Sequence, residues 1–440
     1  MRDYFEELAR AASTLLRGDE SFDLGLAAEE SDFVRLSRGA VRQAGTVTQR
    51  MLTLDLAEGR RHAAGTLTLS GDLEVDRARL GELVRTLREQ RAALPEDPWL
   101  LHPDEVASSE RTRTGRLPER AEVLESLRRA GEGRDLVGLW AAGPVHVGYA
   151  SSRGQRCWLT QTSFNFDWSF HLDGDRAVKA SYAGLEWSAD ELERKVAQAA
   201  AQLELLARPT VQLPPGRYDV ALAPDAVAEL LGMLCWGGFS LRALRTKTSP
   251  LVRMAEEGAT LHPSVTLTED TANGFAPDFQ EQGFRRPPRV ALIERGVLRE
   301  SLVSPRSAAE FGVACNGASA DEAPQSLDMA VGDVPRAELV RRLGRGILVS
   351  NLHYLNYSDR VQARVTGMTR FACFQVEDGE IVAPIGVLRF DDTIYRMLGT
   401  NLLGLTAERD TILDPLTYGG RSLASMRVPG ALVADVAFTL

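Results

Sequence analysis

The sequence is poor in the residues from which disulfide frameworks and metal sites are built. It contains four cysteines and six histidines in 440 residues. No two cysteines form a Cys-x-x-Cys pair, so neither a disulfide-stabilised secreted domain nor a zinc ribbon is indicated. No His-Glu-x-x-His or His-x-x-x-His pair places two imidazoles one turn apart on a helix, where both would reach one metal ion. A reducing cytoplasm is therefore the expected compartment.

Long apolar runs and basic runs are also missing. No apolar stretch approaches the ~20 residues that cross a bilayer, and the charged N-terminal segment MRDYFEELARAASTLLRGDE lacks the apolar core of a secretory signal. The net charge is -10, the pI is near 5.3, and no run of Lys or Arg has the length of a phosphate-binding stripe. We expect neither a membrane nor a nucleic acid as a partner.

Several common catalytic motifs are absent as well. There is no Gly-x-x-x-x-Gly-Lys-Ser/Thr loop to hold phosphates and no Gly-x-Ser-x-Gly turn to present a nucleophilic serine. The nearest match to a dinucleotide fingerprint is Gly131-Glu132-Gly133, but Leu136 stands where a third glycine is needed for close approach of helix and strand. These absences argue against nucleotide-binding and serine-hydrolase chemistry.

A zinc site assembled only by the fold is an alternative, with Cys235, Cys315 and His353 as its ligands. Cys235 lies in the apolar segment GMLCW, and isolated cysteines in such segments are among the most often buried residues. We favour packing over metal binding for the cysteines, and a hydrogen-bonded loop position for His353.

The composition is that of a globular protein, with 44% hydrophobic and 25% charged residues. Helical spacing of apolar residues predicts helices over 75–93 and 189–206, the second opened by a capping box at Ser188. Alternating residues predict an antiparallel meander of short strands over 22–70. They also predict a later hairpin that turns at Asp378-Gly379, a pair suited to a tight type I′ turn.

The segment RPTVQLPPGRYDVALAP predicts a domain boundary. It holds four prolines and one glycine, too many for one regular element, and we place the junction near residues 209–215. The expected fold class is α+β, with an N-terminal domain of helices on an antiparallel sheet (1–208) and a C-terminal domain dominated by antiparallel β-structure (209–440).

The order of several segments resembles the TldD/TldE family, also called PmbA, of paired bacterial and archaeal peptidase-complex proteins. The segments are PPGRYDVALAPDAVAELL, TKTSPL, ALIERGVLRESLVSPRSAAEFG and NYSDRVQARVTGMTRFACFQVEDGEIVAPI. Their order is similar to that of four elements of the family: a strand that precedes the central helix, the central helix itself, a first hairpin, and a terminal hairpin with an Ile-Glu-Asn-Gly-Glu-Ile pattern. The resemblance implies that the helix after PPGRYDVALAP occupies the place of the family's metal-binding helix.

In the catalytic branch of this family that helix carries His-Glu-x-x-x-His, and a cysteine near the C-terminus completes the zinc site. Alignment on TKTSPL places Gly232 and Gly237 at the histidine positions and Met233 at the glutamate position, and the matching late segment LTYGGRSLASM has no cysteine. Zinc hydrolysis needs imidazole or thiolate donors and a carboxylate base, which Gly and Met do not supply. The resemblance therefore implies the TldE-like branch, with no catalytic residue, metal or cofactor in this chain and with zinc in a TldD-like partner.

Five residues are candidates for contact with a peptide substrate. Arg242, Arg245 and Lys247 follow the degenerate helix and would attract acidic groups or a peptide C-terminus. Cations after a helix end are also favourable on a solvated face, and we prefer this second interpretation. Trp236 is either a peptide contact or a core residue, and we expect core packing. His353 lies in the polar and aromatic segment SNLHYLNYSD.

Three functional hypotheses follow. The preferred one is a non-catalytic TldE/PmbA-like subunit of a zinc metallopeptidase complex in peptide proteolysis or maturation, which forms a heterodimer with a TldD-like subunit and shapes its substrate channel. The second is an enzyme without metal, repurposed from the same fold, in which His353, Asp359, Asp391 and Asp392 perform acid and base steps. The third is a homo-oligomeric peptide-binding or scaffolding protein.

Overall fold

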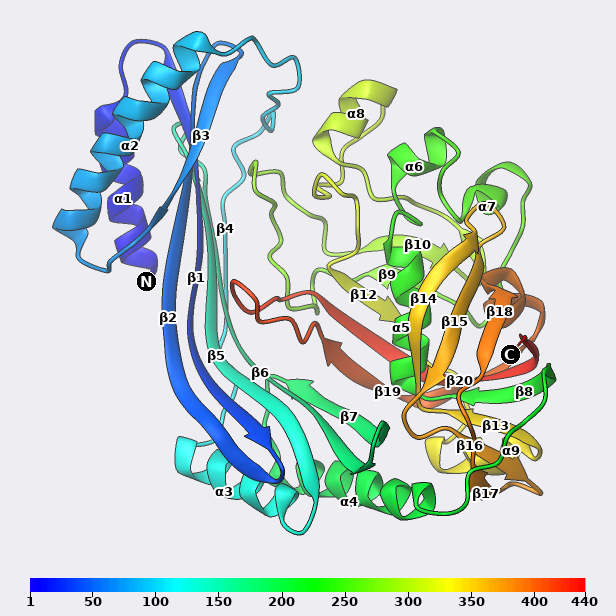
Figure 1. Ribbon diagram of the computed structural model, residues 1–440. Coiled ribbons are helices and arrows are strands. Elements are labelled where there is room, and N and C mark those ends of the chain that lie inside the picture. Colours follow the sequence, from blue (N-terminus) through cyan, green and yellow to red (C-terminus); the bar gives the residue numbers. More distant parts are fainter. Residues whose placement is uncertain (440) are drawn as a thin grey trace.

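The computed structural model describes residues 1–439 and contains two β-sheets with helices packed against them (Figure 1). Each sheet takes its strands from one half of the sequence, and most strand pairs are antiparallel. The predicted α+β class is confirmed. Within residues 1–439 there is no helix with the length and apolar character needed to cross a membrane.

The first sheet has seven strands in the order β3-β2-β1-β5-β6-β4, with β7 paired to β6. Only β4, which runs parallel to β6, departs from the antiparallel pattern of this sheet. The strands are β1 (Glu20–Ser37), β2 (Ala40–Glu58), β3 (Arg61–Thr68), β4 (Ser109–Arg113), β5 (Asp135–Ser151), β6 (Arg156–Asp173) and β7 (Arg176–Gly184).

Four helices pack against the first sheet, two at each end (Figure 1). They are α1 (Arg2–Leu15), α2 (Leu73–Ala93), α3 (Arg120–Gly131) and α4 (Ala189–Leu206). The predicted cap of α4 is confirmed, because the Ser188 hydroxyl accepts a hydrogen bond of 3.3 Å from the Glu191 N–H. Asp72 caps α2 in the same way.

The second sheet has thirteen strands, and its main path is β11-β10-β9-β12-β20-β8-β13-β16-β17. A branch of β14, β15 and β18 joins it through β20, and β19 also pairs with β20. The strands are β8 (Gly216–Leu222), β9 (Leu267–Glu269), β10 (Val290–Glu294), β11 (Val297–Leu298), β12 (Ser326–Met329), β13 (Gly346–Val349), β14 (Asn351–Asp359), β15 (Arg364–Arg370), β16 (Phe374–Glu377), β17 (Glu380–Pro384), β18 (Arg389–Thr393), β19 (Leu402–Leu413) and β20 (Ser425–Phe438).

One helix of the second half, α5, packs between β14 and β20 near the centre of the molecule (Figure 1). The shorter helices lie around the rim of the sheet. The helices of this half are α5 (Pro224–Cys235), α6 (Leu241–Arg245), α7 (Val252–Glu256), α8 (Pro305–Phe311), η1 (Arg336–Glu338), α9 (Leu339–Leu343) and η2 (Arg396–Thr400).

The two halves share an apolar core. Trp140 and Phe164 of the first sheet belong to the same buried cluster as Ala221, Phe374 and Leu432 of the second. Burial of apolar side chains from both sheets in one cluster holds the halves together. The boundary between residues 208 and 209 stays a prediction, and the strands of each sheet lie entirely on one side of it.

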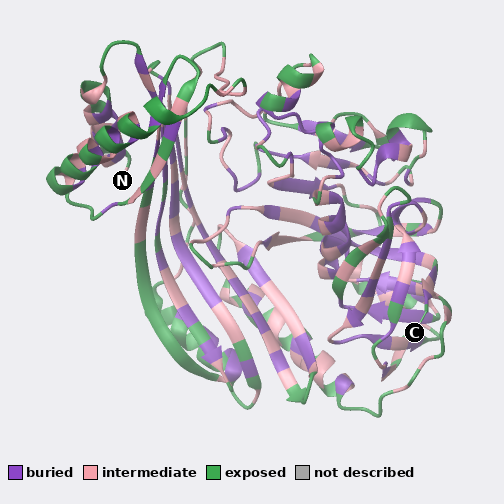
Figure 2. Cartoon of the chain, turned by 45° about the horizontal axis from the view of Figure 1, so that its top comes forward, coloured by how far each residue is buried: buried purple, intermediate pink, exposed green. Residues whose placement is uncertain are grey.

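The meander over residues 22–70 is confirmed, but its first two strands are longer than predicted. β1 and β2 have 18 and 19 residues and pair along their whole length. The first half of β2 is exposed on both faces, with Val41 and Val47 in contact with solvent, and is green in Figure 2. The first half of β2 has no buried face and thus no alternation from which its length can be judged, so the sequence predicted shorter strands over this range.

Candidate functional site

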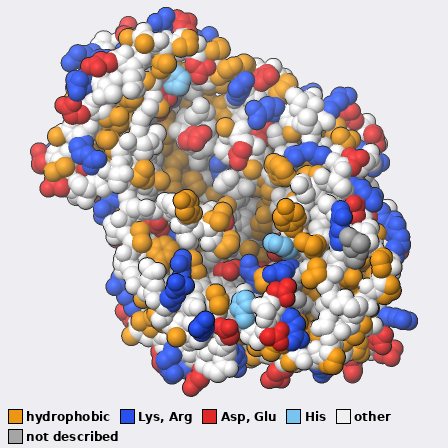
Figure 3. Space-filling view, in the orientation of Figure 1, with side chains coloured by type: hydrophobic (Ala, Val, Ile, Leu, Met, Phe, Trp, Pro, Cys, Tyr) orange, Lys and Arg blue, Asp and Glu red, His pale blue; other side chains and the backbone are white. Residues whose placement is uncertain are grey.

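A cleft lies where α5 faces the first sheet. It is bordered by β6 and β7, by one side of α5, and by the ends of β19 and β20. It comprises a cavity of about 400 Å³ and a second cavity of about 280 Å³ next to α4, which share Lys179, Ser181, Asp225 and Asn351. We call these two cavities the α5 cleft. The space-filling view shows the molecule hollowed between its halves, with hydrophobic side chains along the hollow (Figure 3).

The sequence of α5 gives the helix one apolar side and one acidic side. Leu231 and Leu234 are fully buried in the C-terminal core. Asp225 and Glu229 are four residues apart, lie on the same helix face, and line the α5 cleft. Pro224 begins the helix, where its fixed φ and missing N–H are compatible with a first turn.

The basic side chains of the cleft are already paired. Lys179 of β7 forms an ion pair of 3.3 Å with Asp167 of β6. Lys195 of α4 and Arg336 both pair with Asp410 of β19, at 3.4 and 2.9 Å. These ion pairs occupy the three cations, and none of them pairs with the carboxylates of α5.

The two carboxylates of α5 have no ion-pair partner within residues 1–439. Asp225 accepts a hydrogen bond of 3.4 Å from the Ser181 hydroxyl. Glu229 accepts hydrogen bonds from the Leu352 N–H and, at 3.5 Å, from the Asn351 side-chain amide. Both carboxylates are thus held in place by neutral donors.

This environment changes the acidity of the cleft. Burial, reinforced by the negative charge of Asp410, raises the pKa of Asp225 to about 6. Burial likewise raises the pKa of Glu229 to about 7. Both groups therefore gain and lose protons near neutral pH, which is characteristic of functional sites. Burial also raises the pKa of the neighbouring Cys235 thiol to about 12, so this cysteine is not a reactive thiolate.

Gly232 and Met233, two of the positions aligned with zinc-site residues, point to different sides of α5. Gly232 lies on the stripe that contains Glu229, and a Cβ built on it meets no atom within 4 Å. Met233 is buried in the C-terminal core, and its carbonyl accepts a hydrogen bond of 2.5 Å from the Tyr357 hydroxyl. Only the first of these positions has open space around it.

Gly237 lies beyond the end of α5, which stops at Cys235. Its φ of +77° is in the left-handed region that favours glycine, and a Cβ there would lie 2.8 Å from an Arg360 guanidinium nitrogen. The next residue, Gly238, donates its N–H to the Leu234 carbonyl at 2.8 Å. The break in the sequence LCWGGFS is therefore a glycine helix cap.

The loop between β19 and β20, residues 414–424, borders the α5 cleft with both of its ends. Arg421 ties it to the first sheet by donating to the Gly143 carbonyl at 2.9 Å and to the Ser163 hydroxyl at 2.8 Å. Burial lowers the pKa of Arg421 to about 10. Tyr418 at the tip of the loop is fully exposed. The two segments that the sequence alignment places at the family's zinc motifs thus both border this cleft.

The residues present do not fit a zinc ion. Within residues 1–439 no three His, Cys, Asp or Glu side chains are grouped so that they could hold a metal. Cys235 lines the cleft, the Cys315 thiol donates to the Val303 carbonyl at 3.4 Å, and His353 is exposed on β14. The alternative ligand set considered from the sequence is therefore not assembled.

Trp236 is not a core residue, and the expectation of core packing is wrong. Its side chain is 59% exposed. The Arg360 guanidinium lies over the rings of both Trp236 and Tyr357, 5.0 and 5.1 Å from their centroids. Because α5 ends one residue earlier, the helical periodicity that would bury this position does not reach it.

The basic residues after α5 lie on an exposed surface. Arg242 and Arg245 belong to α6 and are exposed, and Lys247 pairs with Glu256 at 2.9 Å. None of them lines the α5 cleft, and neither does His353, which lies on the exposed side of β14. The candidates for peptide contact are therefore not gathered with α5 around one cavity.

The acidic residues considered for an enzyme without metal form ion pairs or hydrogen bonds with nearby residues. Asp391 pairs with Arg364 at 2.5 Å, and Asp392 pairs with Arg396 at 3.0 Å. Asp359 accepts the N–H of a turn residue at 3.1 Å. These contacts stabilise neighbouring strands and a turn, so each of the three side chains has a structural role.

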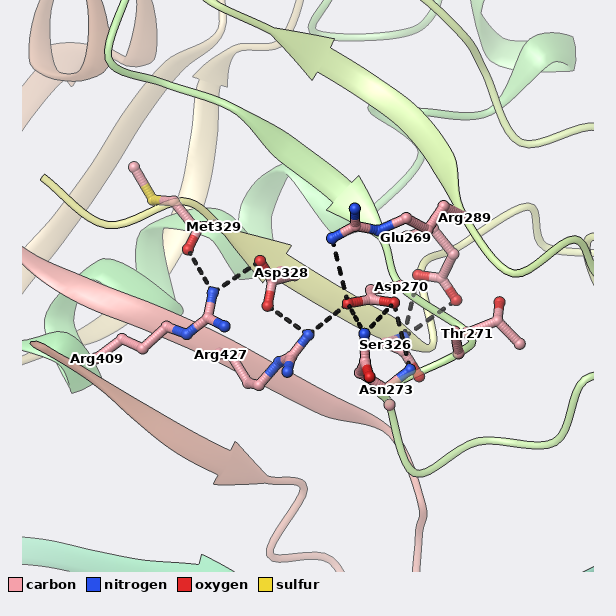
Figure 4. Close-up of polar contacts among 12 residues, drawn as sticks. Glu269, Asp270, Thr271, Asn273, Arg289, Ser326, Asp328, Met329, Arg409 and Arg427 are labelled. Atoms are coloured by element: carbon pink, nitrogen blue, oxygen red, sulfur yellow. Dashed lines mark hydrogen bonds and ion pairs between the residues drawn. The ribbon is translucent and has the colours of Figure 1, made fainter. Parts of the chain in front are cut away.

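A largely buried ionic network joins strands of the second sheet next to the cleft (Figure 4). Arg427 of β20 binds Asp270 and Asp328, each at 2.6 Å, and Arg409 of β19 binds Asp328 at 2.8 Å. The network ties β12, β19 and β20 together, and Met426 of β20 lines the α5 cleft. Its charges are mutually satisfied, and its role is to position these strands.

The functional residues that sequence reasoning missed are Asp225, Glu229 and Asn351. A signal for the first two is present: PDAVAELLGMLC is an apolar helix with acidic residues four apart. Carboxylates at that spacing share a face, and a buried helix has no structural need for them. Asn351 comes from a strand more than a hundred residues later, and no local pattern links it to α5.

Comparison with known proteins gives the same fold for the whole chain. The profile described as "PmbA/TldA metallopeptidase C-terminal domain" matches residues 215–439. TldE from Thermococcus kodakarensis superposes with a TM-score of 0.77 at 14% identity, over 99% of this chain and 100% of that one. Two candidate DNA-gyrase modulators are similar in structure: one from Thermotoga maritima (TM-score 0.76, 13% identity, 99% of both chains) and one from Bacteroides thetaiotaomicron (0.76, 16%, 99% and 98%).

No curated protein matches the sequence. The structural likenesses, at 16% identity or less, establish the fold. The profile covers more than half of the chain, including α5 and the loop between β19 and β20. On that basis the chain belongs to the PmbA/TldD family.

Proposed function

We propose that this chain is a TldE/PmbA-like subunit that performs no zinc chemistry itself and pairs in the cytoplasm with a TldD-like zinc peptidase. The observation that carries this proposal is the donor set of the α5 cleft. The helix that aligns with the family's metal-binding helix has Gly232 at a position with open space around it, and no three His, Cys, Asp or Glu side chains are grouped to hold a metal within residues 1–439. Zinc and the attacking water would belong to the partner.

In this proposal the chain shapes the path by which a peptide reaches the partner. The α5 cleft is walled by both halves of the molecule, and the loop held by Arg421 borders it. A cleft between firmly packed elements can hold one segment of an extended chain in a fixed position. The complex would act in peptide proteolysis or peptide maturation.

The test is to express this chain with and without a TldD-like protein from the same organism. We expect the two to co-purify, zinc to follow the partner, and peptide hydrolysis to appear only in the mixture. Mass measurement of the complex, metal analysis and a peptide-library assay report these three outcomes. Full activity of the partner alone, with no binding between the proteins, would sink the proposal.

The pair Asp225 and Glu229 favours a second candidate, an acid and base enzyme without metal. Two carboxyl groups that titrate near pH 6 and pH 7 are suited to exchanging protons with a substrate. Hydrolysis of peptides by the isolated chain after treatment with a chelator would support this function over the first. A stable homodimer that ignores the TldD-like protein would instead support a homo-oligomeric binding protein.

A further inference from the structure

Three side chains with oxygen acceptors line the α5 cleft, and none of them forms an ion pair with a basic side chain within residues 1–439. Two are the carboxylates of Asp225 and Glu229, which have only neutral donors as partners. The third is the Oδ1 atom of Asn351, which accepts no hydrogen bond within residues 1–439 although the side chain is only 2% exposed. A buried polar atom without a partner costs free energy, so a ligand that satisfies it is favoured.

The orientation of the Asn351 amide follows from its neighbour. Its nitrogen faces Glu229 at 3.5 Å, which suits a donor beside a carboxylate. The reversed amide would place two acceptors against each other. Oδ1 is therefore the free atom, and Asn351 lines both cavities of the cleft together with Asp225.

The ligand that matches three acceptors is a cation with several N–H donors. The lysines and the arginine of the cleft are bound to Asp167 and Asp410, so they do not fill this role. A metal ion is less favoured, because within residues 1–439 no three His, Cys, Asp or Glu side chains are grouped so that they could hold one. Much of the remaining lining of the larger cavity is apolar, including Ala228, Leu327 and Ile412, and such a surface suits an organic amine.

We propose that the α5 cleft binds a primary ammonium group, the free α-amino end of a peptide, between Asp225, Glu229 and Asn351. The three N–H donors of an ammonium group equal the three acceptors in number. The first side chain of the peptide would lie in the apolar part of the cavity of about 400 Å³. This inference deepens the proposed function, since it names the part of the peptide that this chain holds.

The charge of the cleft gives the interaction a pH window. The carboxyl groups titrate near 6 and 7, so an ammonium ion is bound less well as both become protonated on acidification. Above about pH 8 the α-amino group itself loses its proton. Binding is therefore strongest from about pH 7 to 8. The other titratable groups facing the pair are Asp167, Lys179, Lys195, Cys235, Arg336, Asp410 and Asp414.

Calorimetric titration of the full chain with short peptides tests the proposal. The probes are Ala-Leu-Ala amide with a free amino end, the same peptide acetylated, and an acetylated peptide with one lysine. We expect the free peptide to bind and the acetylated one to bind at least tenfold more weakly, as for loss of a hydrogen bond to a charged group. Binding of the lysine peptide alone would assign the cleft to a side-chain ammonium and overturn the assignment to the peptide end.

Two isosteric variants locate the site. Asp225→Asn and Glu229→Gln should each weaken binding of the free peptide about tenfold or more, while Asp359→Asn, an exposed position outside the cleft, should leave it unchanged. Both variants remove a carboxylate whose ionisation is disfavoured by burial, so they should fold. Equal binding of free and acetylated peptides, or wild-type binding by both variants, would refute the inference.

Two further measurements separate this inference from others. Titration with zinc or magnesium alone should give the same heat for the wild type and the Asp225→Asn variant. A binding heat that the variant abolishes would assign the cleft to a metal instead. Co-purification of the same variants with the TldD-like partner is scored independently. If the chain binds the partner but does not distinguish free from acetylated peptides, only this inference is refuted. If it binds the free peptide but no partner, only the proposed complex is refuted.

Discussion

Glu229→Gln should stabilise the protein at alkaline pH and have little effect at acidic pH. Burial raises the pKa of Glu229 from its ordinary value of 4.5 to about 7, so the folded chain binds this proton more tightly than the unfolded chain. The stability that comes from the protonated carboxyl is present below about pH 4.5 and is lost as the pH rises through about 7. A glutamine cannot ionise and retains an acceptor for the Leu352 N–H, so it avoids this loss.

The magnitude follows from the difference between the two pKa values. Each pKa unit corresponds to about 1.4 kcal/mol, so the gap between 4.5 and about 7 amounts to about 3 kcal/mol. Glu229 is partly exposed and lines the α5 cleft, so we reduce the expected gain to about 2 kcal/mol.

Urea unfolding of the variant and the wild type at about pH 5 and about pH 8 measures this gain. Most of it should be absent at the lower pH. Glu204→Gln, an exposed change on α4, is the matched control and should have no effect at either pH. An equal advantage of Glu229→Gln at both values would refute the reasoning, because the effect would then not arise from ionisation.

Five other substitutions test the structural roles assigned above. Gly232→His should alter the free energy of unfolding by less than about 1 kcal/mol, whereas Gly237→His should cost about 2 kcal/mol from its left-handed φ, and equal urea midpoints would contradict this difference. Arg421→Met should speed proteolysis of the loop between β19 and β20 without unfolding the chain, and an unchanged cleavage rate by limited proteolysis would count against the anchor. Arg427→Met should lower the free energy of unfolding by about 3 kcal/mol or more in thermal denaturation, and Arg289→Met by less than about 1 kcal/mol. The reverse ranking would contradict the supporting role of the network.

Local signals in the sequence predicted the elements that depend on local chemistry. The cap at Ser188 begins α4, because a hydroxyl acceptor beside the first free N–H groups is enough to place a helix start. Asp378 and Gly379 both have positive φ, 49° and 77°, as a type I′ turn requires, and they join β16 to β17. Each of these features is decided within a few residues.

The helix end and the cleft depended on tertiary structure. The glycine pair after Trp236 is compatible with either a kink or an end of the helix, and the end of α5 at Cys235 exposes the indole. The cleft joins Asp225 to Ser181 of the first sheet and to Asn351 of β14, across an interface formed only in the folded chain. Residue spacing predicts a shared helix face, but it does not predict what lies opposite that face.

The positions aligned with zinc-site residues are unequal in this backbone. Gly232 has open space, whereas Met233 fills the core and Gly237 lies in a left-handed cap next to Arg360. A carboxylate at position 233 would be buried without a partner, and an imidazole at 237 would strain the backbone. Restoring the three side chains therefore would not restore a zinc site, because the backbone after α5 is arranged to end a helix.

The carboxylates of α5 oppose the stability of the fold that contains them. At neutral pH the ionisation of Asp225 and Glu229 in a partly buried cleft costs free energy, and within residues 1–439 no basic side chain forms an ion pair with either carboxylate. Apolar residues or amides at the two positions would make a more stable helix. Groups that lower stability are characteristic of sites whose function needs them. A bound cation would satisfy both carboxylates and the free oxygen of Asn351 together, so the same ligand would account for three unfavourable features of this cleft.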